Sequence, residues 1–328
     1  MTRLTLRLDL RTPPFARCPD DYYRTALDMA EWADAHGFSE CMLSEHHGEE
    51  DGYLPSPLVM AAAIAARTRR MRIRISALIL PLHDPLRIAE DVAVLDRLSG
   101  GRIELVCVAG FRPGEFAQFD KPFAARIKLL EHGIATLKQA WSGEPFTYLG
   151  RKVRITPRPL QRPHPPLLLG GSSQQAARRA ARIADGFVPA VPELYPIYHE
   201  TCQTLGVTPS EQRHSGSAAA VFLSADPAAA WARIAPHALH ETNSYARWYA
   251  ETGTVGPYQP ITEAATLRES GLYQVLSVSE GLGLAQTLGD NGWLFVHPLL
   301  AGLDPEVGWE TLRLFGEALL PALRQAPD

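Results

Sequence analysis

The sequence predicts a single α/β domain, residues 1–328, folded as a closed (βα)8 barrel. Strand-like and helix-like segments alternate along the chain, and about eight of the strand-like segments are candidates for parallel pairing. A length of 328 residues suits one barrel of this size. Polar residues also gather directly after strand-like segments, where barrels of this class carry their chemistry. These three observations favour a barrel over an open, doubly wound sheet.

The first half of the chain predicts four strand–helix pairs. Asp20 is expected to cap the first helix, and Gly37 to end it. The turns before the strands are short, which is typical of parallel βαβ units. The expected strands are residues 4–10, 38–43, 71–80 and 102–108, and the expected helices are residues 20–36, 58–68, 88–98 and 123–141.

The alternation breaks after residue 141. Residues 146–155 predict a two-stranded hairpin inserted around Gly150, and residues 156–166, with five prolines, predict an extended segment. Pro236 is expected to end or kink the helix that contains it, because proline lacks the N–H donor. An extended loop, residues 252–260, precedes the last strands. The remaining expected strands are 167–169, 187–188, 217–223 and 293–296, and the helices are 174–184, 193–205, 227–248, 261–270, 279–288 and 307–323.

Composition excludes several classes of protein. The chain is 46% hydrophobic and 21% charged with a formal net charge of -4, which is ordinary for a globular protein. No basic run with interleaved aromatic residues predicts nucleic-acid binding. No apolar run reaches the roughly 18 residues of a membrane span, and the N-terminus lacks the apolar core of a signal peptide. The four cysteines lie far apart in sequence, so reduced thiols and a cytoplasmic location are expected.

The segment Ser44, Glu45, His46 and His47 directly follows the expected strand 38–43. Histidine is the side chain whose ordinary pKa lies nearest neutral pH, so it suits acid–base chemistry at a strand end. The alternative interpretation is a pair of surface histidines in a loop.

A metal site is the competing interpretation of this rim, because His83 and Asp84 follow the next strand. Such residues would suit a metal hydrolase. However, adjacent side chains on extended backbone point to opposite sides, so His46 and His47 would diverge. No metal is therefore expected.

The loop Gly170, Gly171, Ser172 and Ser173 lies between an expected strand and an expected helix. Glycines allow close approach of a ligand to the backbone, and a helix start offers free N–H groups to an anion. The alternative is a glycine turn with a serine N-cap. The loop is not a dinucleotide fingerprint, because no G-x-G-x-x-G is present.

Small residues at 76 and 77 either leave room for a flat ligand or pack in the core. Arg112 and Glu115, in the loop after the fourth strand, either contact substrate or are solvated, and Arg126 follows at the start of a helix.

In order and spacing, several of these segments resemble the bacterial luciferase-like, flavin- or deazaflavin-dependent oxidoreductases. The resemblance covers most of the chain and implies a (βα)8 barrel with a flavin at the carboxyl ends of the strands. It is carried by residues 45–47, 76–85, 89–102, 170–173, 184–186 and 297–303.

The resemblance also implies roles for individual residues. His46 matches the catalytic histidine beside the flavin ring, and Ser76 and Ala77 match a non-proline cis peptide that supports this ring. Ala109 stands where luciferase carries an arginine, so one phosphate contact is missing, and Arg126 is the candidate to replace it. The phosphate-binding loop would be Gly170, Gly171, Ser172 and Ser173.

The implied function is that of a two-component monooxygenase. It would use reduced FMN, supplied by a flavin reductase, and molecular oxygen on a small organic substrate, and it would form a homodimer. Phe111, Trp141 and the loop 252–260 are expected to shape the substrate pocket. The alternatives are a deazaflavin-dependent hydride-transfer oxidoreductase and a catalytically silent flavin-binding accessory protein.

Overall fold

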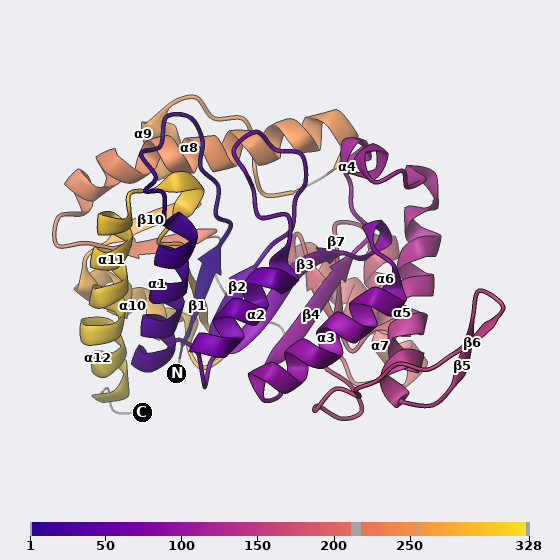
Figure 1. Cartoon of the computed structure of the whole chain (residues 1–328). Helices are drawn as coiled ribbons and strands as arrows, with labels where there is room; N and C mark the ends of the chain where they lie inside the picture. The colour runs from indigo at the N-terminus through magenta and orange to yellow at the C-terminus, as the bar shows by residue number, and fades with distance from the viewer. Residues whose placement is uncertain (1, 211–217, 255, 326–328) are drawn as a thin grey trace.

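The computed structural model describes residues 2–210, 218–254 and 256–325 (Figure 1). Its main body is a curled sheet of seven parallel strands in the order β11-β1-β2-β3-β4-β7-β8. The strands are β1 (Arg3–Leu8), β2 (Glu40–Leu43), β3 (Arg72–Ile79), β4 (Ile103–Val108), β7 (Leu167–Gly171), β8 (Gly186–Pro189) and β11 (Trp293–Val296).

Helices connect these strands and cover the outer face of the sheet (Figure 1). In the first two thirds of the chain they are α1 (Tyr22–His36), α2 (Pro57–Arg67), α3 (Pro85–Ser99), α4 (Pro113–Gln118), α5 (Arg126–Ser142), α6 (Gln174–Ile183) and α7 (Tyr195–Leu205). After these come α8 (Pro227–Thr252), α9 (Ala264–Glu269), α10 (Val278–Leu288), α11 (Pro305–Arg313), a π-helical turn (Leu314–Leu319) and α12 (Leu320–Gln325).

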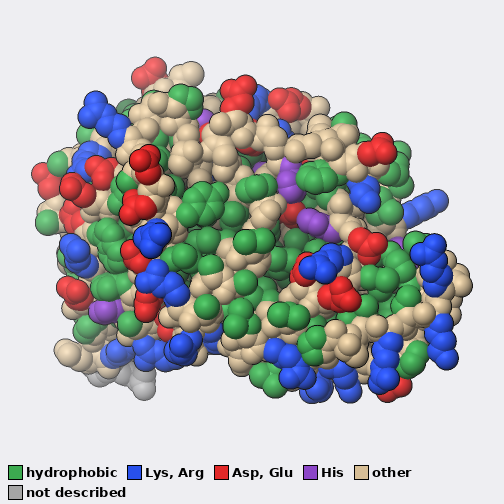
Figure 2. Space-filling model, in the orientation of Figure 1, with side chains coloured by type: hydrophobic (Ala, Val, Ile, Leu, Met, Phe, Trp, Pro, Cys, Tyr) green, Lys and Arg blue, Asp and Glu red, His purple; other side chains and the backbone are tan. Residues whose placement is uncertain are grey.

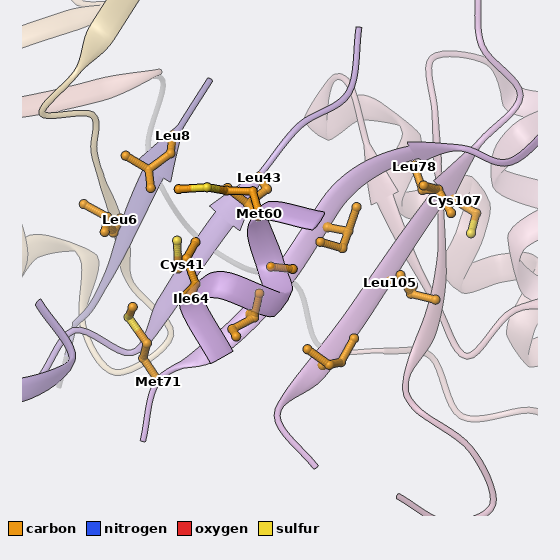
Figure 3. Close-up of a cluster of buried hydrophobic side chains, with 14 of the residues drawn as sticks. Leu6, Leu8, Cys41, Leu43, Met60, Ile64, Met71, Leu78, Leu105 and Cys107 are labelled. Atoms are coloured by element: carbon orange, nitrogen blue, oxygen red, sulfur yellow. The ribbon is translucent and has the colours of Figure 1, made fainter. Parts of the chain in front are cut away.

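Side chains of a strand alternate between the two faces of its sheet. In this sheet the side chains on the outer face are mainly apolar. Cys41 and Leu43 of β2 pack against Met60 and Ile64 of α2, as Figure 3 shows. Full burial of an aliphatic side chain of this size contributes about 1.5–3 kcal/mol. This apolar layer holds helices and sheet together.

The inner face of the sheet is polar. Thr5 donates a hydrogen bond to Glu40 (3.2 Å), and Arg74 forms an ion pair with Glu104 (2.9 Å). These side chains are buried, so each charge needs its partner inside the protein. The concave side of the sheet therefore carries polar chemistry, and its carboxyl end is the place to look for a site.

The last third of the chain adds a second, two-stranded parallel sheet, β9 (Ala220–Leu223) with β10 (Tyr273–Leu276). β9 lies beside β11, and α8, 26 residues long, crosses above the carboxyl ends of the strands (Figure 1). Among the described residues, the hydrogen-bonded ladders join seven strands in one sheet, β9 with β10 in a second, and β5 (Phe146–Tyr148) with β6 (Arg151–Val153) in a third. The curled parallel sheet is thus established, and its complete closure stays a prediction.

The predicted hairpin is confirmed as β5 (Phe146–Tyr148) paired with β6 (Arg151–Val153). Two expectations were wrong. α1 begins at Tyr22 with Asp21, not Asp20, at its N-cap, and Asp21 makes no side-chain capping bond. α4 forms in the segment after the fourth strand, which we expected to be a loop. β10 lies in a segment for which no strand was predicted. The helix predicted at residues 227–248 is confirmed as α8, which contains Pro236.

Two expected features include a residue outside the described ranges. The expected strand 217–223 includes residue 217, and the expected loop 252–260 includes residue 255. Within the described part of the chain, no helix combines the length and the apolar character required to cross a bilayer.

Candidate active site

Small residues line the carboxyl ends of β3, β4 and β7. Ser76, Ala77, Ala109, Gly170 and Gly171 all keep part of their surface exposed, whereas most residues earlier in these strands are buried. A Cβ atom on Gly170 would lie 2.7 Å from Val108 Cγ1, and one on Gly171 would collide with Ala176. A side chain at either position would force its neighbours to shift, so both positions favour glycine.

The polar residues that follow β2 hydrogen-bond to β3 before and after a bend in that strand. The Ser76–Ala77 peptide is cis, as the resemblance implies, and the register with β4 shifts between Ser76 and Leu78. Ser44 Oγ donates to the Ser76 carbonyl (2.8 Å), and the Ile79 N–H donates to Glu45 (2.5 Å). The polar residues after β2 therefore position the neighbouring strand as well as presenting histidines.

His46 forms a buried dyad with Glu115 of the short helix α4. Its Nδ1 lies 2.8 Å from Glu115 Oε1, and this oxygen also accepts from the His47 N–H (3.1 Å) and from Arg112 (3.3 Å). Because a carboxylate accepts hydrogen bonds, Nδ1 carries the proton, and Nε2 is left for a reacting group. Glu115, which the sequence left ambiguous, is thus a positioning residue for His46.

His47 points away from His46, as predicted, and binds Glu45. Glu45 Oε1 accepts from His47 Nε2 (2.9 Å) and from His83 Nε2 (2.7 Å). Burial opposes ionisation of Glu45, but the bonds from His47, His83 and the Ile79 N–H outweigh it and lower the pKa of this carboxyl to about 2. Glu45 is therefore a buried, ionised acceptor.

Glu45, His47 and His83 also form a set of three possible metal ligands, with donor atoms within 4.8 Å of one another. The residues that we weighed as a metal site were Glu45, His46, His47, His83 and Asp84. Three of them, Glu45, His47 and His83, come together, whereas His46 bonds to Glu115 instead. A second buried set of this kind contains Asp9, Glu241 and His297.

We expect the Glu45→Gln variant to change the acid stability of the protein. The pKa of Glu45 is lowered from an ordinary 4.5 to about 2, so its contribution is complete above pH 4.5 and is lost as the pH falls toward 2. The variant should be less stable than the parent at pH 7 and should lose less stability across that window. Urea unfolding at a series of pH values measures this, with exposed Glu50→Gln as the control; equal pH slopes in parent and Glu45→Gln would refute the assignment.

Aromatic rings from α8 and two loops surround His46. The ring centroids of Trp248, Tyr53, Tyr245 and Phe111 lie 4.6, 4.8, 5.8 and 6.0 Å from that of His46. The expectation for Phe111 is therefore supported by its position, and α8 supplies most of the other rings. Sequence reasoning missed the α8 residues, although three aromatic residues within 245–249 were a visible signal.

Buried ion pairs fasten α8 over the site. Arg7 of β1 pairs with Glu241, which also accepts from Tyr273 (2.7 Å). Arg11 donates to Asp51 (2.7 Å) and to Ser244 of α8 (2.7 Å). None of these pairs was predicted, because their members lie far apart in sequence.

The structure places the other predicted site residues in different environments. Ser173 is the N-cap of α6 and accepts from the Ala176 N–H (3.2 Å), so the serine cap that we had weighed as the alternative is present. Arg126 donates to the Phe123 carbonyl (3.2 Å) and lies over the Phe123 ring. The expectation for Trp141 was wrong: it is fully buried and donates to the Ala89 carbonyl (3.0 Å) in the helical layer.

Comparison with protein families gives one model that matches most of the chain. It is described as luciferase-like monooxygenase and matches residues 5–275. Among curated proteins, uncharacterized protein y4wF of Sinorhizobium fredii is 36% identical over 165 residues, 48% of each chain. The FMNH(2)-dependent dimethylsulfone monooxygenase of Pseudomonas putida is 29% identical over 176 residues, 51% of this chain and 48% of that one. The chain spans about half the length of these curated relatives.

Solved structures resemble the whole chain. The oxygenating constituent of 3,6-diketocamphane monooxygenase from Pseudomonas putida, in complex with FMN, has a TM-score of 0.76 at 19% identity and covers 98% of both chains. An F420-dependent secondary alcohol dehydrogenase has a TM-score of 0.70 at 16% identity and covers 99% of both. At these identities the likeness establishes the fold.

Proposed function

Because this chain belongs to the luciferase-like monooxygenase family, we propose that it is a two-component monooxygenase that uses reduced FMN and molecular oxygen on a small organic substrate. The observation that carries the proposal is the Glu115–His46 dyad beside the small residues that end β3, β4 and β7. A histidine held by a carboxylate next to an open strand edge suits proton transfer to a bound ligand.

The described residues fit a flavin phosphate and ring. Gly170 and Gly171 end β7 without side chains, and α6 begins directly after Ser173, so the positive N-terminal end of this helix lies next to the loop. We assign Gly170, Gly171, Ser172 and Ser173 to the phosphate. Arg126 is the candidate for a further phosphate contact.

The ring would lie against β3 and β4. Ser76 and Ala77 form the bend that would support it, and Ala109 is too small to obstruct it. When bound, the reduced flavin supplies the electrons that activate oxygen. His46 would hold or donate a proton at Nε2, while Glu115 keeps the ring of His46 in the required orientation.

A deazaflavin is the second candidate cofactor, and Ala109 favours it, because an alanine offers no guanidinium to the FMN phosphate. Hydride transfer would then replace monooxygenation. A silent flavin-binding protein is a third possibility, and the buried His46–Glu115 dyad argues against it.

Absorbance titration of the purified protein with FMN and, separately, with F420 tests this proposal. We expect saturable binding of FMN and, with a reductase, NADH and oxygen, oxidation of the flavin linked to product. Exclusive binding of F420 would favour hydride transfer, and binding of neither would refute the flavin assignment.

We propose no metal, because hydrogen bonds already occupy Glu45. Elemental analysis showing about one zinc or iron per chain, with activity lost on chelation, would contradict this.

A flavin reductase is the protein partner that this chemistry needs, since the oxygenating component must receive its flavin reduced. The free thiols of all four cysteines suit a reducing cytoplasm.

We also propose a homodimer through α2 and α3. Val59, Val94 and Leu98 on these helices are 72, 54 and 51% exposed, and Figure 2 shows hydrophobic side chains gathered on this face. Such a patch commonly marks an interface. Sedimentation velocity should give twice the 36.0 kDa chain mass, and a monomer would exclude the dimer.

A further inference from the structure

The side chains of α8 that meet the site are aromatic. Tyr245 and Tyr249 are four residues apart and therefore lie on one face of the helix, with Trp248 beside them. Phe111, which follows β4, contacts this face, with its ring centroid 5.9 Å from that of Tyr249. Tyr258 stacks on Tyr245 at 4.7 Å. The roof above His46 is thus made of rings.

Part of this roof is accessible. Phe111, Tyr245 and Tyr249 keep some of their surface exposed, whereas Trp248, whose ring lies nearer to His46, is fully buried. The exposed rings come from α8 and from the loop after β4, so they approach the site from two sides. A ligand beside His46 Nε2 would meet ring faces and edges in preference to aliphatic chains.

Much of the aliphatic surface lies on the outer face of the sheet. Leu6, Leu43 and Leu105 point outward and pack against the helices, as Figure 3 shows. Ile79, Leu82 and Val108 form a smaller cluster with Phe116, after the carboxyl ends of β3 and β4. The rings around His46 are therefore the feature of this site that would favour a planar substrate over an open-chain one.

The roof also has polar features. The Tyr53 and Tyr245 hydroxyls bond to each other (2.8 Å), and the buried Trp248 Nε1–H has no acceptor within the described chain. A buried donor without an acceptor is costly, and this one belongs to the aromatic ring that lies 4.6 Å from the His46 ring. The guanidinium of Arg112 lies 4.4 Å from the Trp248 ring and adds positive charge nearby.

We propose that the substrate is a planar aromatic compound. This inference rests on the proposed function, since it names the substrate class of the same site. Aromatic pairs favour offset and edge-to-face contacts and add up to roughly a factor of ten in affinity beyond the area that they bury.

Calorimetric titration with three ten-carbon alcohols tests the proposal: planar 1-naphthol, the saturated and puckered decahydro-1-naphthol, and open-chain 1-decanol. The full chain is titrated with and without FMN. We expect 1-naphthol to bind about tenfold more tightly than either of the others. Tyr249→Leu should remove most of this preference, with its thermal midpoint measured to confirm folding. Tyr23→Leu, at an exposed ring on α1, is the matched control and should keep it.

Equal or tighter binding of either saturated alcohol overturns the proposal, as does no binding of 1-naphthol or an unchanged preference in Tyr249→Leu. Absorbance titration of the same samples with FMN and F420 keeps the two conclusions separate. Flavin binding without aromatic preference would refute the substrate class alone. Aromatic preference without binding of either cofactor would refute the proposed function.

Discussion

The His46→Ala variant should lose about a hundredfold or more in turnover, the usual cost of removing a positioned proton-transfer group. Nε2 is the only ring nitrogen of His46 that Glu115 leaves free for chemistry. Cofactor affinity should change much less, because the proposed phosphate loop, residues 170–173, lies at the end of β7, on another strand. Steady-state turnover with saturating reduced FMN, measured beside flavin affinity and thermal stability, checks this.

His47→Ala is the internal control. Its side chain points to Glu45 and His83, away from the His46 dyad, so its loss of turnover should be much smaller. Glu115→Gln should fall between the two, because it weakens the hold on His46 without removing the ring. Equal mild losses in both histidine variants would mean that this pair is structural and that another group, such as His83, performs the proton transfer.

The Ser173→Asp variant should weaken FMN binding by about tenfold or more. It places a negative charge beside the dianionic phosphate, and such a like-charge contact costs well over about 1 kcal/mol when partly buried. Ser173 is the N-cap of α6, and aspartate caps helices as well as serine does, so the fold should be retained. Fluorescence or absorbance titration with FMN measures the change.

Ser277→Asp provides a control, because Ser277 also accepts from a backbone N–H at the start of a helix outside the proposed site, although its cap additionally includes the Glu280 side chain. It should leave FMN affinity unchanged. If Ser173→Asp also binds FMN as tightly as the parent, the phosphate lies elsewhere, and residues 170–173 are only a turn.

Local patterns predicted most of the parallel strands and the helices between them. The alternation of the first four strand–helix pairs and the hairpin around Gly150 depend on residues that are close in sequence, and the structure confirms them. The elements that were missed carry weak local signals. β10 has only four residues, and α4 begins Pro-Gly-Glu, a composition typical of turns. α8 continues past Pro236 because its contacts with the sheet outweigh one missing backbone hydrogen bond.

The residues of the site also divide into those with a local sequence signal and those without one. His46 and the glycines of the phosphate loop follow strands directly, so position alone drew attention to them. Glu115 is 69 residues from His46, and Glu241 is 234 residues from Arg7. No local periodicity reports a pairing over such distances. The aromatic roof on α8 was missed for the same reason. Its rings can be assigned to the site only once the helix is known to cross above the strands.

The pairing of β1 with β11 has a consequence for how this protein is made. β1 lies between β2 and β11, and Arg7 of β1 relies on Glu241 for its ion pair. A ribosome adds roughly 5–20 residues per second, so β11 and Glu241 are synthesised about ten seconds or more after β1. During translation the nascent chain therefore exposes one unpaired strand edge and one uncompensated charge in what will be the interior. Such an edge can pair with other chains. Of the strands in this sheet, β1 is synthesised before the others and is among the last to have both of its neighbours.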